Sequence, residues 1–252
     1  MGSPNGGINS VRTALEILET VKDYEGMRLV DIAEEMDMPK SSVHRYLKTL
    51  EQKEYLIRRG NKYLISGKFL HFAHRVYHRD PAYQMVEEKI DHLAEETDEL
   101  VQFLIEEHGR IVYVFQATGG QGIQIDTESG GFGHLHSTAG GKAILSTWTD
   151  EEVKAYVERR GLPQITPHTI TNIDDLFSEI RSVHSEGYAI NDEENIEGVR
   201  AIAVPIKRDQ KAIGAICISG PINRMKGQVF TEELPDLLLG VENELELNFR
   251  FL

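Results

Sequence analysis

PKSSVHRYLKTL, residues 39–50, is the stretch from which the fold can be read. Its apolar residues recur at i, i+3, i+4 and i+7, the spacing of one face of an α-helix; they are Val43, Tyr46, Leu47 and Leu50. The opposite face holds hydroxyl groups and two cations but no carboxylate; it comprises Ser41, Ser42, Arg45, Lys48 and Thr49, with His44 on its flank. The pattern predicts a helix that packs on a core with one face and offers hydrogen-bond donors with the other.

The segments on either side make this helix part of a larger motif. Residues 29–36 repeat the apolar spacing, and Asp37-Met38-Pro39 breaks it, because the residue before a proline is disfavoured in a helix. Two short amphipathic helices joined by a few residues are typical of a helix-turn-helix, whose second helix reads DNA. Within residues 55–65, Gly60-Asn61 separates two β-prone runs, which predicts a tight hairpin.

These three elements, in this order, predict a winged helix-turn-helix. We expect the second helix to enter the major groove while the tip of the hairpin contacts phosphates. The expected DNA-binding residues are Lys40, Ser41, Ser42, His44, Arg45, Lys48, Arg58, Arg59, Asn61 and Lys62.

Length and charge indicate two parts of different character. A chain of 252 residues suits two domains. The net charge is −14, but residues 1–80 hold 13 Lys and Arg against 11 Asp and Glu, whereas residues 81–252 hold 14 against 30. Because the cations of the first part gather on the recognition helix and wing, we expect the acidic remainder to stay off DNA.

The location of the protein is also suggested by the sequence. There is no run of about 18 apolar residues that would predict a membrane span. The first nine residues show no apolar signal segment. The single cysteine, Cys217, excludes an intrachain disulfide and fits a reducing compartment. We therefore expect a cytoplasmic protein.

Two further helices flank the predicted DNA-binding motif. The first covers residues 10–24, and its expected inner stripe is Val11, Ala14, Leu15, Leu18 and Val21. The second, residues 68–79, is apolar on two sides and must be covered on more than one face, so we interpret it as a linker helix that pairs with its counterpart in a dimer. It also carries His71, His74 and His78, but the Cys or Glu that would complete a zinc site is absent nearby, and no metal is expected. The expected domains are residues 1–66, the linker 67–81, and residues 82–252.

The second domain mixes helices and strands. The patterns predict helices over residues 83–97, 149–160 and 173–186 and a largely helical segment from residue 231. Strands are predicted over residues 100–105, 111–115, 121–126, 199–206 and 212–219. An apparently antiparallel sheet flanked by helices is an α+β domain.

A Gly-rich loop, residues 130–145, is the first candidate binding element. It is not a P-loop, because His136 and Ala143 stand where that motif requires Gly and Ser or Thr. Instead, Gly140 and Gly141 would let backbone N–H groups approach a ligand just before a helix that begins at Lys142. A helix start favours an anion such as a carboxylate. The alternative is a plain tight turn before a helix.

Catalysis has little support. His134 and His136 could form a metal or acid–base pair, but Ser137 lacks a G-x-S-x-G context and Cys217 lies in an apolar strand, where a buried thiol is usually inert. The acidic run of residues 192–194, with Glu197, could bind a cation or form a solvated loop. Because no nucleophile, base and orienting group come together, we expect neither an enzyme nor a cofactor.

At this point the chain clearly resembles the IclR family of bacterial and archaeal transcription regulators. Five segments look like recurring segments of that family, in the family's order: SVRTALEIL, PKSSVHRYLKTLEQKEYL, STAGGKAIL, EGYAINDEENIEGVRAIAVPI and ICISGP. The resemblance implies a winged helix-turn-helix, a linker helix, and a GAF- or profilin-like effector domain. It also implies a homodimer or dimer of dimers on operator DNA and a small organic effector, often a carboxylate or an aromatic molecule.

The same resemblance implies a set of effector-binding residues. By position they are Gly140, Gly141, Lys142, Asn191, Glu194, Ala201, Cys217 and Ser219, with apolar walls from Leu135, Ile216 and Ile218. Asn191 stands where the family commonly has aspartate and Cys217 where it commonly has serine. The expected pocket is therefore less acidic and poorer in hydroxyl groups.

The leading interpretation is a regulator of a metabolic pathway that responds to a small organic effector. Two alternatives stay open. One is a cytoplasmic enzyme whose N-terminal part is an interaction module, which the missing catalytic set disfavours. The other is an architectural DNA-binding protein with a ligand-free second domain, which the Gly-rich loop before a helix disfavours.

Overall fold

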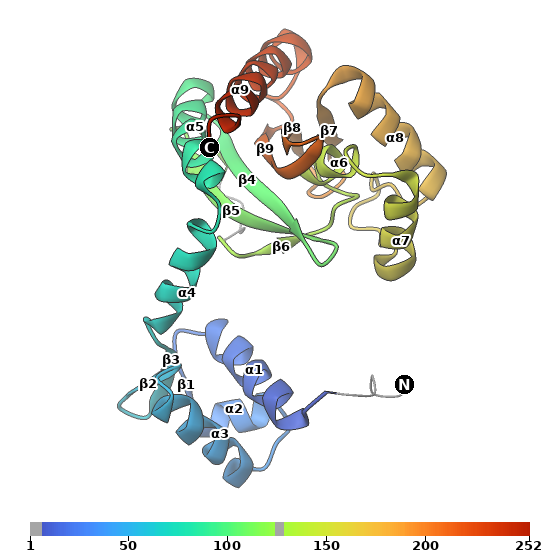
Figure 1. Ribbon diagram of the computed structural model, residues 1–252. Helices are drawn as coiled ribbons and strands as arrows, with labels where there is room; N and C mark the ends of the chain where they lie inside the picture. The colour runs from blue at the N-terminus through green and yellow to red at the C-terminus, as the bar shows by residue number, and fades with distance from the viewer. Residues whose placement is uncertain (1–6, 124–128) are drawn as a thin grey trace. The chain divides into compact units, whose positions relative to one another are not determined.

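The structure is a computed structural model that describes residues 7–123 and 129–252. The chain divides into two compact units, Met1–Arg79 and Asp80–Leu252 (Figure 1). No helix among the described residues is long and apolar enough to cross a membrane.

The first unit is a winged helix-turn-helix, as predicted. Its elements are α1 (Asn9–Lys22), β1 (Met27–Arg28), α2 (Leu29–Glu35), α3 (Lys40–Gln52), β2 (Leu56–Arg59), β3 (Lys62–Ile65) and α4 (Lys68–Tyr77). The antiparallel strands lie in the order β1-β3-β2, so the wing has a third, short strand that the sequence did not predict. The predicted stripe of α3 is confirmed, because Val43, Leu47 and Leu50 are buried in the core of this unit.

The inner face of α1 differs from the prediction. Ile17 and Val21 are the fully buried residues of this helix, whereas Val11 and Leu15 are each 54% exposed. The prediction is right for Val21, which is buried, and for Ala14 and Leu18, which pack partly buried against the core. It missed Ile17, and Val11 and Leu15 form a stripe on the surface instead. That surface stripe forms one side of an apolar groove that Tyr46, Leu50, Tyr55 and Phe69 complete.

The second unit is built on one six-stranded antiparallel sheet in the order β6-β5-β4-β9-β8-β7. Its strands are β4 (Leu100–Glu107), β5 (Arg110–Thr118), β6 (Phe132–Gly133), β7 (Ala189–Asp192), β8 (Val199–Arg208) and β9 (Lys211–Pro221). Its helices are α5 (Pro81–Thr97), α6 (Ala139–Leu145), α7 (Asp150–Arg160), α8 (Ile173–Glu186), the π-helix η1 (Val229–Glu233) and α9 (Leu234–Phe249). This is the expected α+β architecture.

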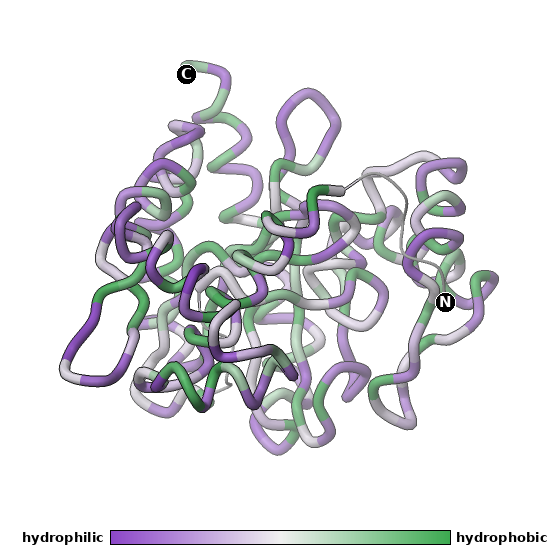
Figure 2. The backbone as a smooth tube through the Cα atoms, turned by 90° about the horizontal axis from the view of Figure 1, so that it is seen from below, coloured by the Kyte–Doolittle hydropathy of each residue, from purple (hydrophilic) through white to green (hydrophobic). Residues whose placement is uncertain are grey.

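Helices cover both faces of this sheet (Figure 1). Helices α5 and α9 pack on one face, where the ring of Tyr83 on α5 lies 5.2 Å from that of Phe103 on β4. Helices α6 and α8 pack on the other face, over Leu104, Ala203 and Cys217. Figure 2 shows that hydrophobic and hydrophilic residues alternate along the helices. This alternation gives a helix one apolar face that can pack on the sheet.

Most predicted elements of this unit are confirmed, and three differ. The helix over residues 173–186 and the capping box of Thr149 and Glu152 are found as predicted. Residues 121–123 are not a strand, and the rest of the strand predicted at 121–126 lies outside the described residues. The edge strands β6 and β7 were not predicted; β6 has only two residues, too few to show a period.

Candidate functional site

The first candidate site is the outer face of α3. Of the ten residues expected to bind DNA, nine are exposed and Ser42 is partly buried. Because Val43 and Leu47 anchor the opposite face, this row of donors is held on a helix rather than on a loop. The face carries hydroxyl groups, an imidazole and cations, which suit phosphate oxygens and base edges.

The wing beside α3 is stiffened by contacts that the sequence did not reveal. Arg58 Nε donates to the carbonyl oxygen of Gly60 at 3.0 Å, so this guanidinium is partly committed to the turn itself. Arg28 pairs through its backbone with Lys62 across β1 and β3. Its side chain donates two hydrogen bonds to the Asp31 carboxylate, with N–O distances of 2.6 and 2.8 Å. These bonds hold the pKa of Asp31 below its usual value. The wing is thereby tied to the start of α2.

The second candidate site is a cavity in the second unit, between α6 and the sheet. Its lining residues are Gln102, Leu104, Tyr113, Thr138, Ala139, Asn191, Asn195, Ile196, Val199, Ala201, Cys217 and Ser219. The cavity has a volume of about 40 Å³, enough for about three water molecules. A larger molecule therefore requires one wall to move.

The polar groups of this cavity are uncharged. Within the part of the chain that the structure describes, no Asp, Glu, His, Lys or Arg lines the cavity. Burial raises the pKa of the Tyr113 hydroxyl and that of the Cys217 thiol, the latter to about 11, so both stay protonated near neutral pH. The Ser219 hydroxyl lies 3.5 Å from Cys217 Sγ. The cavity thus offers hydroxyl, thiol and amide groups to a ligand.

Contrary to the prediction, the Gly-rich stretch does not present the N–H group of Gly141 to a ligand. Helix α6 begins at Ala139, capped by Thr138, so both glycines lie inside its first turn. The N–H of Gly141 donates to Thr138 Oγ1 at 3.2 Å. A Cβ on Gly141 would lie 2.2 Å from the carbonyl oxygen of Leu135, and one on Gly140 would lie 2.2 Å from a methyl carbon of Leu104. These glycines serve close packing of α6, and neither lines the cavity.

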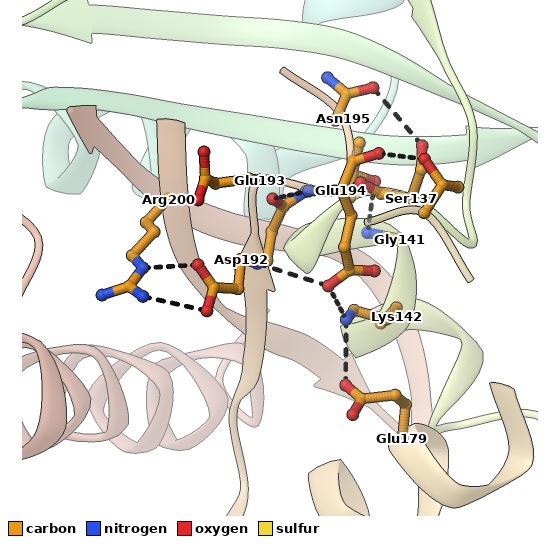
Figure 3. Close-up of polar contacts among 12 residues, drawn as sticks. Ser137, Gly141, Lys142, Glu179, Asp192, Glu193, Glu194, Asn195 and Arg200 are labelled. Carbon is orange, nitrogen blue, oxygen red and sulfur yellow. Dashed lines mark hydrogen bonds and ion pairs between the residues drawn. The ribbon is translucent and has the colours of Figure 1, made fainter. Parts of the chain in front are cut away.

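Lys142 and Glu194 do not line the cavity, and their side chains contact each other (Figure 3). Lys142 is fully buried, and its Nζ lies 2.6 Å from Glu194 Oε1 and 3.0 Å from Glu179 Oε2 on α8. Burial raises the pKa of the Glu194 carboxyl, and Lys142 partly offsets this. The cation of the expected effector-binding set is therefore already paired.

His136 is part of the structural frame rather than an acid or base. It is completely buried, with its ring nitrogens 3.1 Å from the Tyr156 hydroxyl and 3.0 Å from the carbonyl oxygen of Pro163. Burial lowers its pKa, which favours the neutral ring. The described residues contain no group of three or more His, Cys, Asp or Glu placed to hold a metal ion.

Matches to known families decide what these two sites belong to. The family description "Bacterial transcriptional regulator IclR C-terminal" matches residues 74–241, and "IclR helix-turn-helix domain" matches residues 10–60. The chain belongs to the IclR family. It is a transcription regulator with a helix-turn-helix DNA-binding domain and a C-terminal domain of the IclR type.

Whole-chain relatives agree with this assignment. The "Probable HTH-type transcriptional regulator ArcR" of Halobacterium salinarum is 27% identical over 251 residues, covering 95% of this chain and 93% of that protein. The crystal structure of Thermotoga maritima IclR matches with a TM-score of 0.81 at 28% identity, covering 96% of this chain and 99% of that one. An IclR homologue from Microbacterium hydrocarbonoxydans, solved with 4-hydroxybenzoate, shares the fold at a TM-score of 0.81 and 18% identity, covering 96% and 100%.

In this IclR regulator the cavity collects only part of the expected effector-binding set. Asn191, Ala201, Cys217 and Ser219 line it. The Asn191 amide is largely committed, since it donates to the Ser137 carbonyl oxygen at 2.5 Å and accepts from the Glu194 N–H at 3.1 Å. The expected walls Leu135, Ile216 and Ile218 do not line the cavity; the two isoleucines alternate with Cys217 along β9 and so face the other side of the sheet.

Several lining residues of this regulator were missed by sequence reasoning. Gln102 and Leu104 of β4, Tyr113 of β5, and Asn195 and Ile196 of the segment after β7 all contribute. The period-2 alternation of β4 could have placed Gln102 and Leu104 on the face of the sheet that holds the cavity. No signal in the sequence, however, says which strands become neighbours.

Proposed function

We propose that this regulator binds operator DNA as a homodimer or a dimer of dimers, through α3 and the β2–β3 wing, and that a small organic effector alters this binding. The observation that carries the proposal is the outer face of α3. That face presents Ser41, His44, Arg45 and Lys48 on a helix whose other side is anchored in a core. A rigid helix with donors and cations on its free side is what major-groove reading requires.

The cavity in the second unit is the proposed effector site. Its neutral lining suits hydroxyl, carbonyl or amide groups on a small aromatic or aliphatic molecule. The earlier expectation of a carboxylate anchored at the start of α6 loses its support, because the Gly141 N–H is capped and Lys142 is paired. The Microbacterium homologue was solved with 4-hydroxybenzoate, an aromatic carboxylate, which supports a small aromatic effector as a class and keeps a carboxylate group among the candidates.

The surface of α1 and α4 supports the homodimer. Helix α4 has no buried residue, although Phe69 and Phe72 pack on Tyr55. Leu70 is 74% exposed and Leu15 lines the apolar groove beside α4. Exposed apolar surface of this kind marks an interaction site, and we assign it to a second copy of the chain.

Operator binding by two variants tests the proposal. Sites are first selected from random DNA by the full-length protein, and an inverted repeat is expected for a twofold dimer. Arg45→Ala should cost about 1–3 kcal/mol and relax sequence preference at its base contact. Lys62→Ala should weaken all sequences alike and reduce the salt slope by about 1.

Fluorescence anisotropy over a salt series measures both effects. Glu51→Ala, an exposed change near the end of α3, is the control and should not weaken binding. The proposal fails if no sequence is enriched, or if Arg45→Ala retains both the affinity and the selectivity of the wild type. Adding 4-hydroxybenzoate and related small molecules to the wild-type complex tests the effector, whose binding should shift the operator affinity.

A further inference from the structure

The segment of residues 193–198, here called the cover loop, closes one side of the cavity. Its Asn195 and Ile196 line the cavity and are also partly exposed, so these residues lie between the cavity and solvent on this side. The other described walls are strands of the central sheet and the tightly packed α6. The cover loop has no regular secondary structure. It is therefore the wall most able to open locally.

Besides a hydrogen bond that its carboxylate accepts from the neighbouring Asp192 N–H at 3.4 Å, Glu194 attaches the cover loop at three points. Its N–H donates to Asn191 Oδ1 at 3.1 Å, and its carbonyl oxygen accepts from Thr169 Oγ1 at 2.6 Å. Its carboxylate accepts from Lys142 Nζ at 2.6 Å, which ties the loop to α6 (Figure 3). The first two bonds join backbone to neutral side chains, so the third is the only charged attachment among these contacts of Glu194.

This ion pair is buried and only partly satisfied. Lys142 is fully buried, Glu194 is 7% exposed, and Glu194 Oε2 has no hydrogen-bond partner. Removing one partner of a buried pair leaves an uncompensated charge, so the two groups depend strongly on each other. Lys142 therefore cannot turn to a ligand in the cavity without leaving Glu194 alone.

We propose that Lys142 and Glu194 are positioning residues that fasten the cover loop over the cavity, and that they do not bind the effector directly. This inference rests on the proposed function of the cavity as the effector site. An effector larger than the present cavity fits only when the pair separates and the loop moves outward. The cost of separating the pair then sets part of the effector's affinity.

Hydrogen–deuterium exchange of the full chain, without effector or DNA, tests the inference. In Glu194→Gln, amides of the cover loop should exchange about tenfold faster than in the wild type. Amides of β4 and β5 should keep their wild-type rates, because the change is local. Glu179→Gln is the matched control, since Glu179 also contacts Lys142 but lies on α8 and not on the loop.

A double-mutant cycle tests whether the effect of Glu194→Gln acts through Lys142. Lys142→Met should also speed exchange of the loop, and adding Glu194→Gln to it should bring little further change. Unchanged loop exchange in Glu194→Gln, an equal effect of Glu179→Gln, additive effects in the cycle, or faster exchange throughout the domain would each overturn the inference. Because the assay needs neither effector nor operator, its failure is distinct from failure of the proposed function.

Discussion

At the scale of single residues, the main lesson comes from the two glycines of α6. The sequence suggests that they admit a ligand, yet the structure uses them to bring a helix against β4 and the Leu135 backbone. Both functions require a residue without a Cβ, so residue type alone does not separate them. The distances do, because the space beside Gly141 is already filled by backbone atoms.

Gly141→Ala should therefore destabilise the second unit. The added Cβ would lie 2.2 Å from a backbone oxygen, and such overpacking costs about 1–3 kcal/mol or more. Gly240→Ala on α9 is the control, since no atom lies within 4 Å of its Cβ position, and removing a helical glycine should stabilise by up to about 1 kcal/mol. Urea unfolding followed by the fluorescence of Trp148, the only tryptophan, measures both. Equal stability of the two variants would contradict the packing argument.

At the scale of elements, buried and exposed carboxylates fasten the helices of the second unit in different ways. Glu152 caps α7 and meets Lys211 at 2.9 Å, and these contacts lower its pKa. Glu242 of α9 is buried, and burial raises its pKa despite Lys207 Nζ at 2.7 Å. Both carboxylates have a lysine partner, yet their contributions to stability should change with pH in opposite directions.

The stability of two variants should reveal these opposite signs. Folded Glu242 holds its proton more tightly than the unfolded chain, so its contribution is present at acid pH and is lost as pH rises from 4.5 through the raised folded pKa. Glu152 contributes above its ordinary pKa, and that contribution is lost as pH falls through the lowered folded value. As pH rises, the free energy of unfolding of Glu242→Gln should increase relative to that of the wild type. As pH falls, the free energy of unfolding of Glu152→Gln should increase relative to that of the wild type. Urea unfolding at several pH values measures this, and parallel profiles would contradict it.

At the scale of the whole molecule, charge and apolar surface are distributed unequally. Residues 81–252 carry 30 acidic against 14 basic residues, whereas residues 39–50, which include the proposed DNA-binding residues of α3, contain no carboxylate. The exposed apolar residues of α1 and α4, among them Leu15, Leu70 and Val76, lie in the first unit. This arrangement fits the proposal of one surface for DNA and another for a second copy of the chain.

Leu70→Glu should therefore weaken the dimer, because it places a charge in a contact that excludes water. Light scattering at micromolar concentration should show the wild type at two or four times the chain mass of 28.5 kDa and the variant shifted toward the monomer. Leu247→Glu places the same change at an exposed leucine of α9, and it should leave the dimer intact. A wild type that is monomeric under these conditions, or equal behaviour of the two variants, would refute the assignment of this surface.

Sequence alone determined those features that depend on local spacing. The stripe of α3, the Gly60-Asn61 turn, the capping box at Thr149 and the helix ending at Gly187 each depend on residues within one or two turns, so their patterns are visible in the chain. The order of these elements and the motif segments were enough to indicate the IclR family.

Tertiary structure decided what depends on partners distant in sequence. Lys142 and Glu194 are 52 positions apart, and only the fold brings their charges together. Likewise, the pairing of β4 with β5 and β9 places Tyr113 and Ser219 on one face of the sheet. The packing of α1 buries Ile17 and leaves Leu15 exposed. The reason is physical: ion pairing and burial depend on distances in space, whereas helix and strand periods depend on positions along the chain.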